Sequence, residues 1–431
     1  MREIILQALK KNGVAEYLIR EEKIESAELY FIKKELDMRR LKYITRYEVT
    51  AYRDFEKDGK KMRGFSAAEI FPQMRPEEVK KAVADAYYAA SFAANPYFEL
   101  PSGSKEGHVE QAGKLASLSV EQAAEAFVES LYAADCREDA WINTAEFFVN
   151  RQKISICNSR GIDVSYTRCQ AKGEFVVQCI VGEQSGAPAQ DVEQYQDFAY
   201  NDLDTEALTR QAEEALDAVA ARARAVEAPK SGSYDVILSG KHMREIFSFY
   251  TSRANAQMIY PGYSNYKKGT KVQGETTDGE RVNLTLKAVV PYSYEGISMK
   301  DMELIRDGEL QALYGNARFA SYLGIRPTGL YEAIRVENGT KTMEELKSGP
   351  YLHVVTFSDF QMDEYSGNFG GEIRLAYLYD GGKVTPVTGG SINGNFLELQ
   401  KNMVFSKESY KDSRYEGPMA VKFCGVPVAG A

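Results

Sequence analysis

The sequence contains only three histidines, His108, His242 and His353, and they lie far apart along the chain. His242 and Glu245 are spaced i, i+3, which places them on one face of a predicted helix. One helical turn offers two ligands at most, whereas a zinc site takes three or four, so a metal site here needs ligands from elsewhere. Capping and solvation at a helix start are the favoured interpretation of this pair, and metal binding is the alternative.

Other residue patterns give no local active site. His353 lies in the apolar segment YLHVVTF, which is typical of a structural histidine on a strand. The glycine-rich segments 366–372 and 388–395 lack the strand-then-helix context of a dinucleotide fingerprint and the Lys-Ser/Thr ending of a P-loop, and they are interpreted as hairpin turns. No G-x-S-x-G elbow occurs in the sequence.

Alternation and turn signals predict that the chain opens with antiparallel sheet. A strand is expected at 27–36, and a long hairpin at 43–71 with its turn at Asp58–Gly59. Helical spacing behind a proline predicts an amphipathic helix over 76–93, and the pair Ser119 and Gln122 predicts a capping box at the start of a second helix. The further strands expected before the middle of the chain are 142–150, 153–158 and 161–181.

A long helix from Asp204 to Glu227 is predicted to end before Pro229. We therefore place a boundary between an N-terminal α+β domain, residues 1–230, and a strand-rich α+β domain, residues 231–431. The second domain is expected to begin with a strand and then a helix over 241–258. Turn signals through the remainder predict mixed, largely antiparallel sheets with flanking helices.

The composition, with 44% hydrophobic and 27% charged residues, is that of a globular chain. No stretch approaches the ~18 uncharged apolar residues of a membrane-spanning helix, and the N-terminus has no secretory signal. A net charge of −9 argues against direct nucleic-acid binding. The cysteines are odd in number and never spaced C-x-x-C, which favours reduced thiols in the cytoplasm; they are Cys136, Cys157, Cys169, Cys179 and Cys424.

The second half resembles the TldD/PmbA family, whose older name refers to modulation of DNA gyrase. The resemblance rests on the strand DVIL at 235–238, on TPVTGGSINGN at 385–395 and on GPMAVKFCGVPVAG at 417–430. In the first half, YEVTAYRDFEKDGKKMRGFS at 47–66 resembles the family's N-terminal sheet. These segments occur in the family's order and span essentially the whole chain, which implies a TldD/PmbA-like α+β fold.

The family contains two subunit types that pair, a TldD-type zinc peptidase with an HExxxH helix and a TldE/PmbA-type partner without it. An ungapped count from the DVIL strand places Ser248 and Arg253 at the histidine positions and Phe249 at the glutamate position. A guanidinium has no lone pair for zinc, and no HExxH or HExxxH sequence occurs in the chain. We therefore assign no catalytic, cofactor-binding or metal-binding residue. An ordinary amphipathic helix is the favoured interpretation of these three residues, and a remnant of the cleft is the alternative.

The resemblance implies a non-catalytic subunit of a cytoplasmic zinc metallopeptidase complex that cleaves or matures unfolded peptides. The zinc is then expected in a TldD-like partner, with which this chain forms a heterodimer. An extended peptide is expected to bind as an added strand at a sheet edge. Two alternatives stay open: a self-sufficient peptidase with an atypical site, and a non-enzymatic, peptide-binding homodimer.

Overall fold

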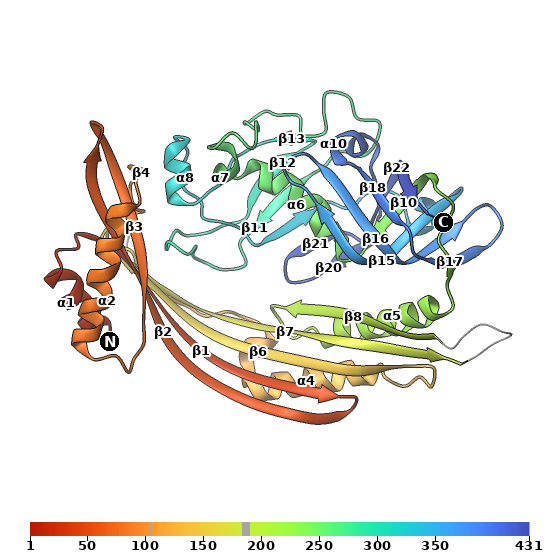
Figure 1. Ribbon diagram of the computed structural model, residues 1–431, viewed down its shortest axis with the longest axis horizontal. Coiled ribbons are helices and arrows are strands. Elements are labelled where there is room, and N and C mark those ends of the chain that lie inside the picture. Colours follow the sequence, from red (N-terminus) through yellow and green to blue (C-terminus); the bar gives the residue numbers. More distant parts are fainter. Residues whose placement is uncertain (104, 183–189, 431) are drawn as a thin grey trace.

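The computed structural model describes residues 1–103, 105–182 and 190–430. Within these ranges the N-terminal half forms an eight-stranded sheet with the order β4-β3-β2-β1-β6-β7-β5, and β8 also pairs with β7. Its long strands curve beneath the C-terminal half (Figure 1). The strands are β1 (Glu16–Ile32), β2 (Glu35–Lys57), β3 (Lys60–Ile70), β4 (Asn95–Pro96), β5 (Lys105–Val109), β6 (Ala140–Asn158), β7 (Asp163–Val181) and β8 (Gln190–Tyr200).

Helices cover one face of this sheet. Alternate side chains of each strand point to opposite faces, and the apolar side chains on one face pack against these helices. Ile19 and Leu29 of β1 belong to the two apolar clusters under the helices, whereas Arg20, between them in alternation, lies on the opposite face. The covering helices are α1 (Arg2–Lys11), α2 (Pro76–Ala89), α4 (Val120–Ala133) and α5 (Thr205–Ala223). The opposite face turns toward the C-terminal half and combines charged side chains with an apolar cluster that includes Leu18, Ile154 and Tyr166.

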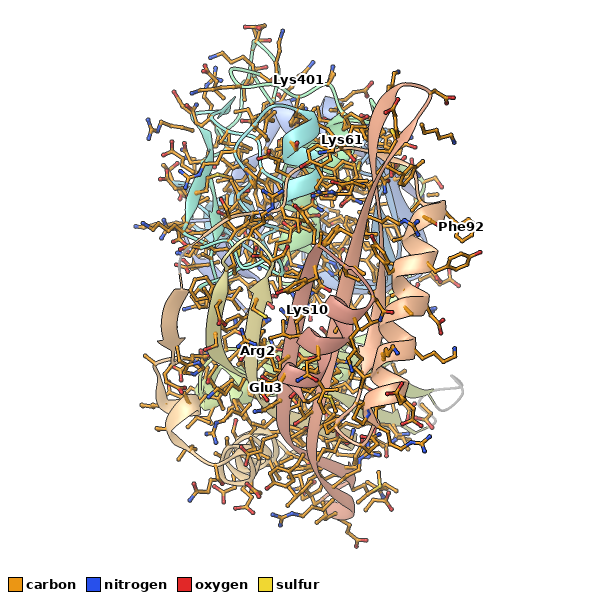
Figure 2. All side chains as sticks on the ribbon, turned by 90° about the vertical axis from the view of Figure 1, so that its left-hand side faces the viewer. Arg2, Glu3, Lys10, Lys61, Phe92 and Lys401 are labelled. Carbon is orange, nitrogen blue, oxygen red and sulfur yellow. The ribbon has the colours of Figure 1, made fainter. Side chains whose placement is uncertain are left out.

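Helices α1 and α2 stand at one end of the sheet, where Figure 2 views the molecule with α1 in front of the strands. Arg2 of α1 donates a hydrogen bond of 2.8 Å to the carboxylate of Asp163, at the start of β7. Phe92, in the short helical turn η1 (Ala90–Phe92), projects outward on this end and is 72% exposed.

The C-terminal half contains two sheets. In the described residues β15, β10, β22, β18 and β16 pair in succession and β15 also pairs with β16, so these strands close into a ring. The first sheet comprises β9 (Val226–Glu227), β10 (Gly232–Ser239), β15 (Tyr351–Met362), β16 (Asn368–Tyr379), β17 (Val384–Thr388), β18 (Ser391–Asn395), β19 (Val404–Phe405) and β22 (Ala420–Ala429). The second comprises β11 (Leu284–Lys287), β12 (Met302–Arg306), β13 (Glu309–Leu310), β14 (Ala333–Val336), β20 (Ser409–Lys411) and β21 (Tyr415–Pro418).

Helix α6 (His242–Ala254) packs against both sheets and contributes to their shared apolar core. Phe247 contacts Phe405 of β19 and Tyr415 of β21, and Tyr250 donates a hydrogen bond to the buried Gln400. Most residues of α6 are therefore buried. The smaller helices are α3 (Lys114–Ser117), α7 (Ala256–Ile259), α8 (Ala317–Tyr322), α9 (Met343–Leu346), α10 (Phe396–Leu399) and η2 (Gln400–Asn402).

Several sequence predictions are confirmed. The fold is α+β with largely antiparallel sheets, and the first long hairpin turns at Asp58–Gly59, where both residues adopt the positive φ that a two-residue hairpin turn of type I′ requires. The predicted capping box is present, because Ser119 and Gln122 exchange their hydrogen bonds at the start of α4. No helix in the described ranges is long and apolar enough to cross a membrane.

Other predictions are wrong in detail. The single helix expected over 241–258 breaks at Asn255, whose extended backbone starts α7 and whose side chain accepts from the backbone N–H of Gln257. The strands expected at 142–150 and 153–158 are one continuous strand, β6. The glycine-rich segment 366–372 is largely strand β16 rather than a turn, and Gly371 is needed there because a Cβ would approach the Phe357 ring to 2.7 Å. The domain boundary at 230 stays a prediction, and β9 before it pairs with β17.

Candidate functional site

His242 and Glu245 lie together at the first turn of α6. The Nδ1 atom of His242 is 4.0 Å from a carboxylate oxygen of Glu245, and both atoms are buried without a hydrogen-bond partner. The imidazole ring packs edge-on against Phe357 and Phe360. Across the described residues, no group of three or more His, Cys, Asp or Glu side chains could hold a metal ion, so this pair gains no third ligand there.

The three residues at the expected zinc-motif positions also lie on α6, but they do not form a polar cleft. The Ser248 hydroxyl donates to the backbone carbonyl of Glu245 within the same helix, at 2.7 Å. Phe249 is fully buried, and its ring packs against Tyr250 and Phe396. Apolar burial at the glutamate position leaves no place for a general base, and the residues present do not fit a catalytic zinc ion.

Arg253 is held inside the protein near the C-terminal end of α6. Its guanidinium donates to the backbone carbonyl of Tyr365 at 2.9 Å and to the amide oxygen of Asn265 at 3.2 Å. The rings of Phe249 and Tyr266 lie 5.3 and 5.0 Å from it. No carboxylate forms an ion pair with Arg253 in the described part of the chain, so the position carries an uncompensated positive charge that repels a metal ion.

The remaining two histidines lie on separate strands. His353 on β15 is buried, and its Nε2 atom lies 2.9 Å from the Ser239 hydroxyl. Burial lowers the pKa of His353 to about 4, with a smaller effect from Lys347. The ring nitrogens of His108 on β5 contact the hydroxyls of Ser165 and Thr167 on β7. The structure brings neither histidine to α6.

A cavity of about 780 Å³ lies between the two halves of the molecule. Its floor is the face of β1, β2, β3, β6 and β7 opposite the helices, and its roof is made by the segments 287–299, 316–319 and 329–332. Aromatic side chains line it from both sides, including Tyr166 below and Tyr292 and Phe319 above. This volume falls within the range of small-molecule sites, so the cavity is a candidate binding site.

The sequence analysis missed this cavity, because none of the residues that it singled out lines it. The available signal was the run of polar side chains at alternate positions, such as Arg20 and Glu22, on strands far longer than average. Alternation predicts that these side chains share a face, but only the tertiary structure shows that the C-terminal half covers that face.

Comparisons with known proteins agree with this architecture. Residues 231–430 match the family described as the PmbA/TldA metallopeptidase C-terminal domain. No curated protein sequence matches the chain. The solved structure of TldE from Thermococcus kodakarensis covers 99% of this chain and 100% of its own, with a TM-score of 0.77 and 17% identity.

Two bacterial structures described as proposed modulators of DNA gyrase are similar to the same extent. The protein from Thermotoga maritima has a TM-score of 0.75 and 18% identity, and the alignment covers 99% of each chain. The protein from Bacteroides thetaiotaomicron has a TM-score of 0.76 and 16% identity, over 100% of this chain and 99% of its own. The similarity to these structures shows the fold of the whole chain.

We predict that Arg253→Ala lowers the free energy of unfolding by about 3 kcal/mol, because it removes two charge-assisted hydrogen bonds and leaves the Tyr365 carbonyl without its donor. Urea unfolding followed by circular dichroism measures the change. The control is Arg306→Ala, since Arg306 is exposed and forms its ion pair among the described residues with Glu303, and it should cost less than about 1 kcal/mol. Equal effects of the two substitutions would contradict a buried structural role for Arg253.

We predict a histidine-dependent loss of stability in acid. The pKa of His353 is about 4 in the folded protein and about 6.5 unfolded, so the unfolded state binds more protons between these values. Stability from this residue is complete above about pH 6.5 and falls as the pH drops toward 4. Between pH 7 and pH 5 the wild type should lose about 2 kcal/mol more than His353→Gln in urea unfolding. Parallel pH profiles would show that His353 is not buried in its neutral form.

Proposed function

We propose that this chain, whose C-terminal domain belongs to the TldD/PmbA family, is a TldE/PmbA-type, non-catalytic subunit of a cytoplasmic peptidase. In this proposal it pairs with a TldD-like chain that holds the catalytic zinc, and the pair cleaves or matures unfolded peptides. The metallopeptidase domain is shared with the family, whereas the accessory role is argued from the residues on α6.

The observation that carries the proposal is that a buried aromatic ring and a guanidinium group occupy the positions on α6 where a metal-binding helix would carry its base and a ligand. Phe249 fills the apolar interior at the position of the general base, and Arg253 places a guanidinium at a ligand position. A zinc peptidase needs lone-pair donors and a base at these places. Placing a histidine and a glutamate at these positions would bury a charged group in the apolar core. Two substitutions alone would therefore not restore a zinc site, because the surrounding packing would also have to change.

The β1–β2 hairpin offers a surface for the partner. Residues 35–46 of β2 pair with β1 on one side, and on the other side no strand of the described ranges pairs with them. We call this segment the free edge. Its side chains include exposed apolar residues, with Tyr43 71% exposed, namely Leu36, Met38, Leu41, Tyr43 and Ile44. Unpaired strand edges with apolar side chains are surfaces that proteins cover by association, and we propose that the TldD-like chain covers this one.

The two other functions make different demands. A self-sufficient peptidase would need a site such as His242 and Glu245, whose buried atoms lack hydrogen-bond partners. A peptide-binding homodimer would use the free edge between two copies of this chain. The first alternative lacks a complete set of catalytic groups on α6. The second gives no role to the metallopeptidase family of the C-terminal domain, so we keep the accessory subunit as the conclusion.

Co-expression tests the function. The purified chain alone should contain less than about 0.1 zinc per molecule and should not cleave an unfolded peptide, because α6 supplies no ligand set. Cleavage should appear with a TldD-like partner and should be lost when the partner's HExxxH glutamate is replaced. Stoichiometric zinc with cleavage by the chain alone would establish the self-sufficient peptidase. Peptide binding without cleavage in both preparations would establish the binding protein.

Charge on the free edge should prevent pairing. We expect the double variant Leu41→Glu/Tyr43→Glu to lose co-purification with a tagged TldD-like chain, because burying two carboxylates opposes association. Its melting temperature should stay close to that of the wild type, since both side chains are exposed. The matched control is Tyr88→Glu/Phe92→Glu, which changes two exposed rings at the opposite end of the molecule. If the control loses the partner and the edge variant retains it, the pairing surface lies elsewhere.

A further inference from the structure

The interdomain cavity is enclosed by contacts between the two halves of the chain. Tyr322 donates to the carbonyl of Pro96 at 2.8 Å at one border. Arg168 forms an ion pair of 3.2 Å with Glu332 across the cavity itself. Farther along, Asn201 donates to the carbonyl of Ser413. The cavity therefore has a fixed floor and roof, and its lining groups are held in place before any ligand arrives.

Several charges on the lining already have partners. Glu332 is paired with Arg168, and Glu22 is paired with Arg46 at 2.6 Å. Lys287 is paired with Asp301, which also accepts from the backbone of the same segment. These groups shape the wall, and a ligand would have to displace an existing ion pair to use them.

Two arginines on the lining have no carboxylate partner within the described residues. Arg318 stacks on Phe319, with its guanidinium 4.8 Å from the ring centroid, and lies 5.7 Å from the Phe65 ring. Its Nε atom is buried and has no hydrogen-bond partner. Arg20, from the floor, lies 5.2 Å from the ring of Tyr294. Rings cover the faces of these guanidinium groups, and the hydroxyls of Tyr166 and Tyr322 interact with Arg20 and Arg318, so a ligand would bind the N–H groups that remain.

The carboxylates near these two arginines form no ion pair with them in the described part of the structure. Glu295 accepts a hydrogen bond from the backbone N–H of Ala317, and burial raises its pKa against the effect of that bond. Glu48 is the cross-strand neighbour of Arg20 but forms no ion pair with it in the described structure. Within the described residues neither carboxylate forms an ion pair with Arg20 or Arg318, so the guanidinium groups of these two arginines are the charges on the lining that remain available to an anion.

We propose that the interdomain cavity binds the free C-terminal carboxylate of a peptide whose last side chain is apolar. The guanidinium group of Arg318 on the roof or of Arg20 on the floor would hold the carboxylate, and the aromatic wall would hold the apolar side chain. A planar guanidinium matches a carboxylate through two parallel hydrogen bonds, and aromatic walls bury an apolar group. The peptide nature of the ligand rests on the proposed function, whereas the anion site rests on the cavity alone.

Calorimetric titration of the single chain, without partner or zinc, tests this site. The probes are N-acetyl-Ala-Ala-Phe with a free carboxylate, the same peptide as its C-terminal amide, and 3-phenylpropionate. The acid should bind at least about tenfold more tightly than the amide, because it alone makes charge-assisted hydrogen bonds. At least one of the variants Arg318→Gln and Arg20→Gln should weaken binding of the acid by about tenfold or more. The exposed Arg306→Gln is the control and should leave binding unchanged.

The outcomes separate this site from the proposed function. Equal binding of acid and amide, or wild-type affinity in both arginine variants, overturns the carboxylate site even if the complex proves to be a peptidase. Binding of 3-phenylpropionate as tight as that of the peptide acid overturns the assignment to peptides. Weakened binding by folded variants, checked by wild-type circular dichroism, supports the site whether or not cleavage is ever observed.

Discussion

The enclosure of helix α6 is the constraint on which the C-terminal half depends. Both sheets pack against this helix, so the polar groups on its buried side depend on partners inside the protein. Arg253 meets that requirement through the Tyr365 carbonyl, the Asn265 amide and two aromatic rings, and Tyr250 meets it through Gln400. A catalytic metal site on the same helix would need a third ligand beside His242 and Glu245, and the described residues supply no group of three.

The two faces of the N-terminal sheet pack against different parts of the protein. One face packs against four helices, which leaves the opposite face, with its charged side chains and a smaller apolar cluster, for the C-terminal half. The charged side chains on that face need partners or water, so this part of the interface packs less tightly than the apolar cluster beside it. A lined cavity with ion pairs at its borders results, and the unpaired Arg20 and Arg318 remain within it. The long hairpin extends past the covering β3 strand and exposes the free edge.

Local signals in the sequence predicted much of the fold. The turn at Asp58–Gly59 and the cap at Ser119 depend on a few neighbouring residues, so the chemistry of those residues was sufficient. The break at Asn255 and the strand conformation of Gly371 depend on contacts with distant segments, which no local pattern records. Helical periodicity is a local signal, so the placement of Ser248, Phe249 and Arg253 on one helix could be predicted. The interdomain cavity depends on contacts between distant segments and could not be.

The most direct test of the accessory role is the location of zinc in the assembled complex. Anomalous scattering at the zinc edge from crystals of this chain with a TldD-like partner would place each metal ion on one chain or the other. The account predicts a single zinc ion per heterodimer, on the partner, with Arg253 of this chain bonded to Tyr365 and Asn265 as it is here. A zinc ion on this chain, at His242 and Glu245 or elsewhere on α6, would contradict it.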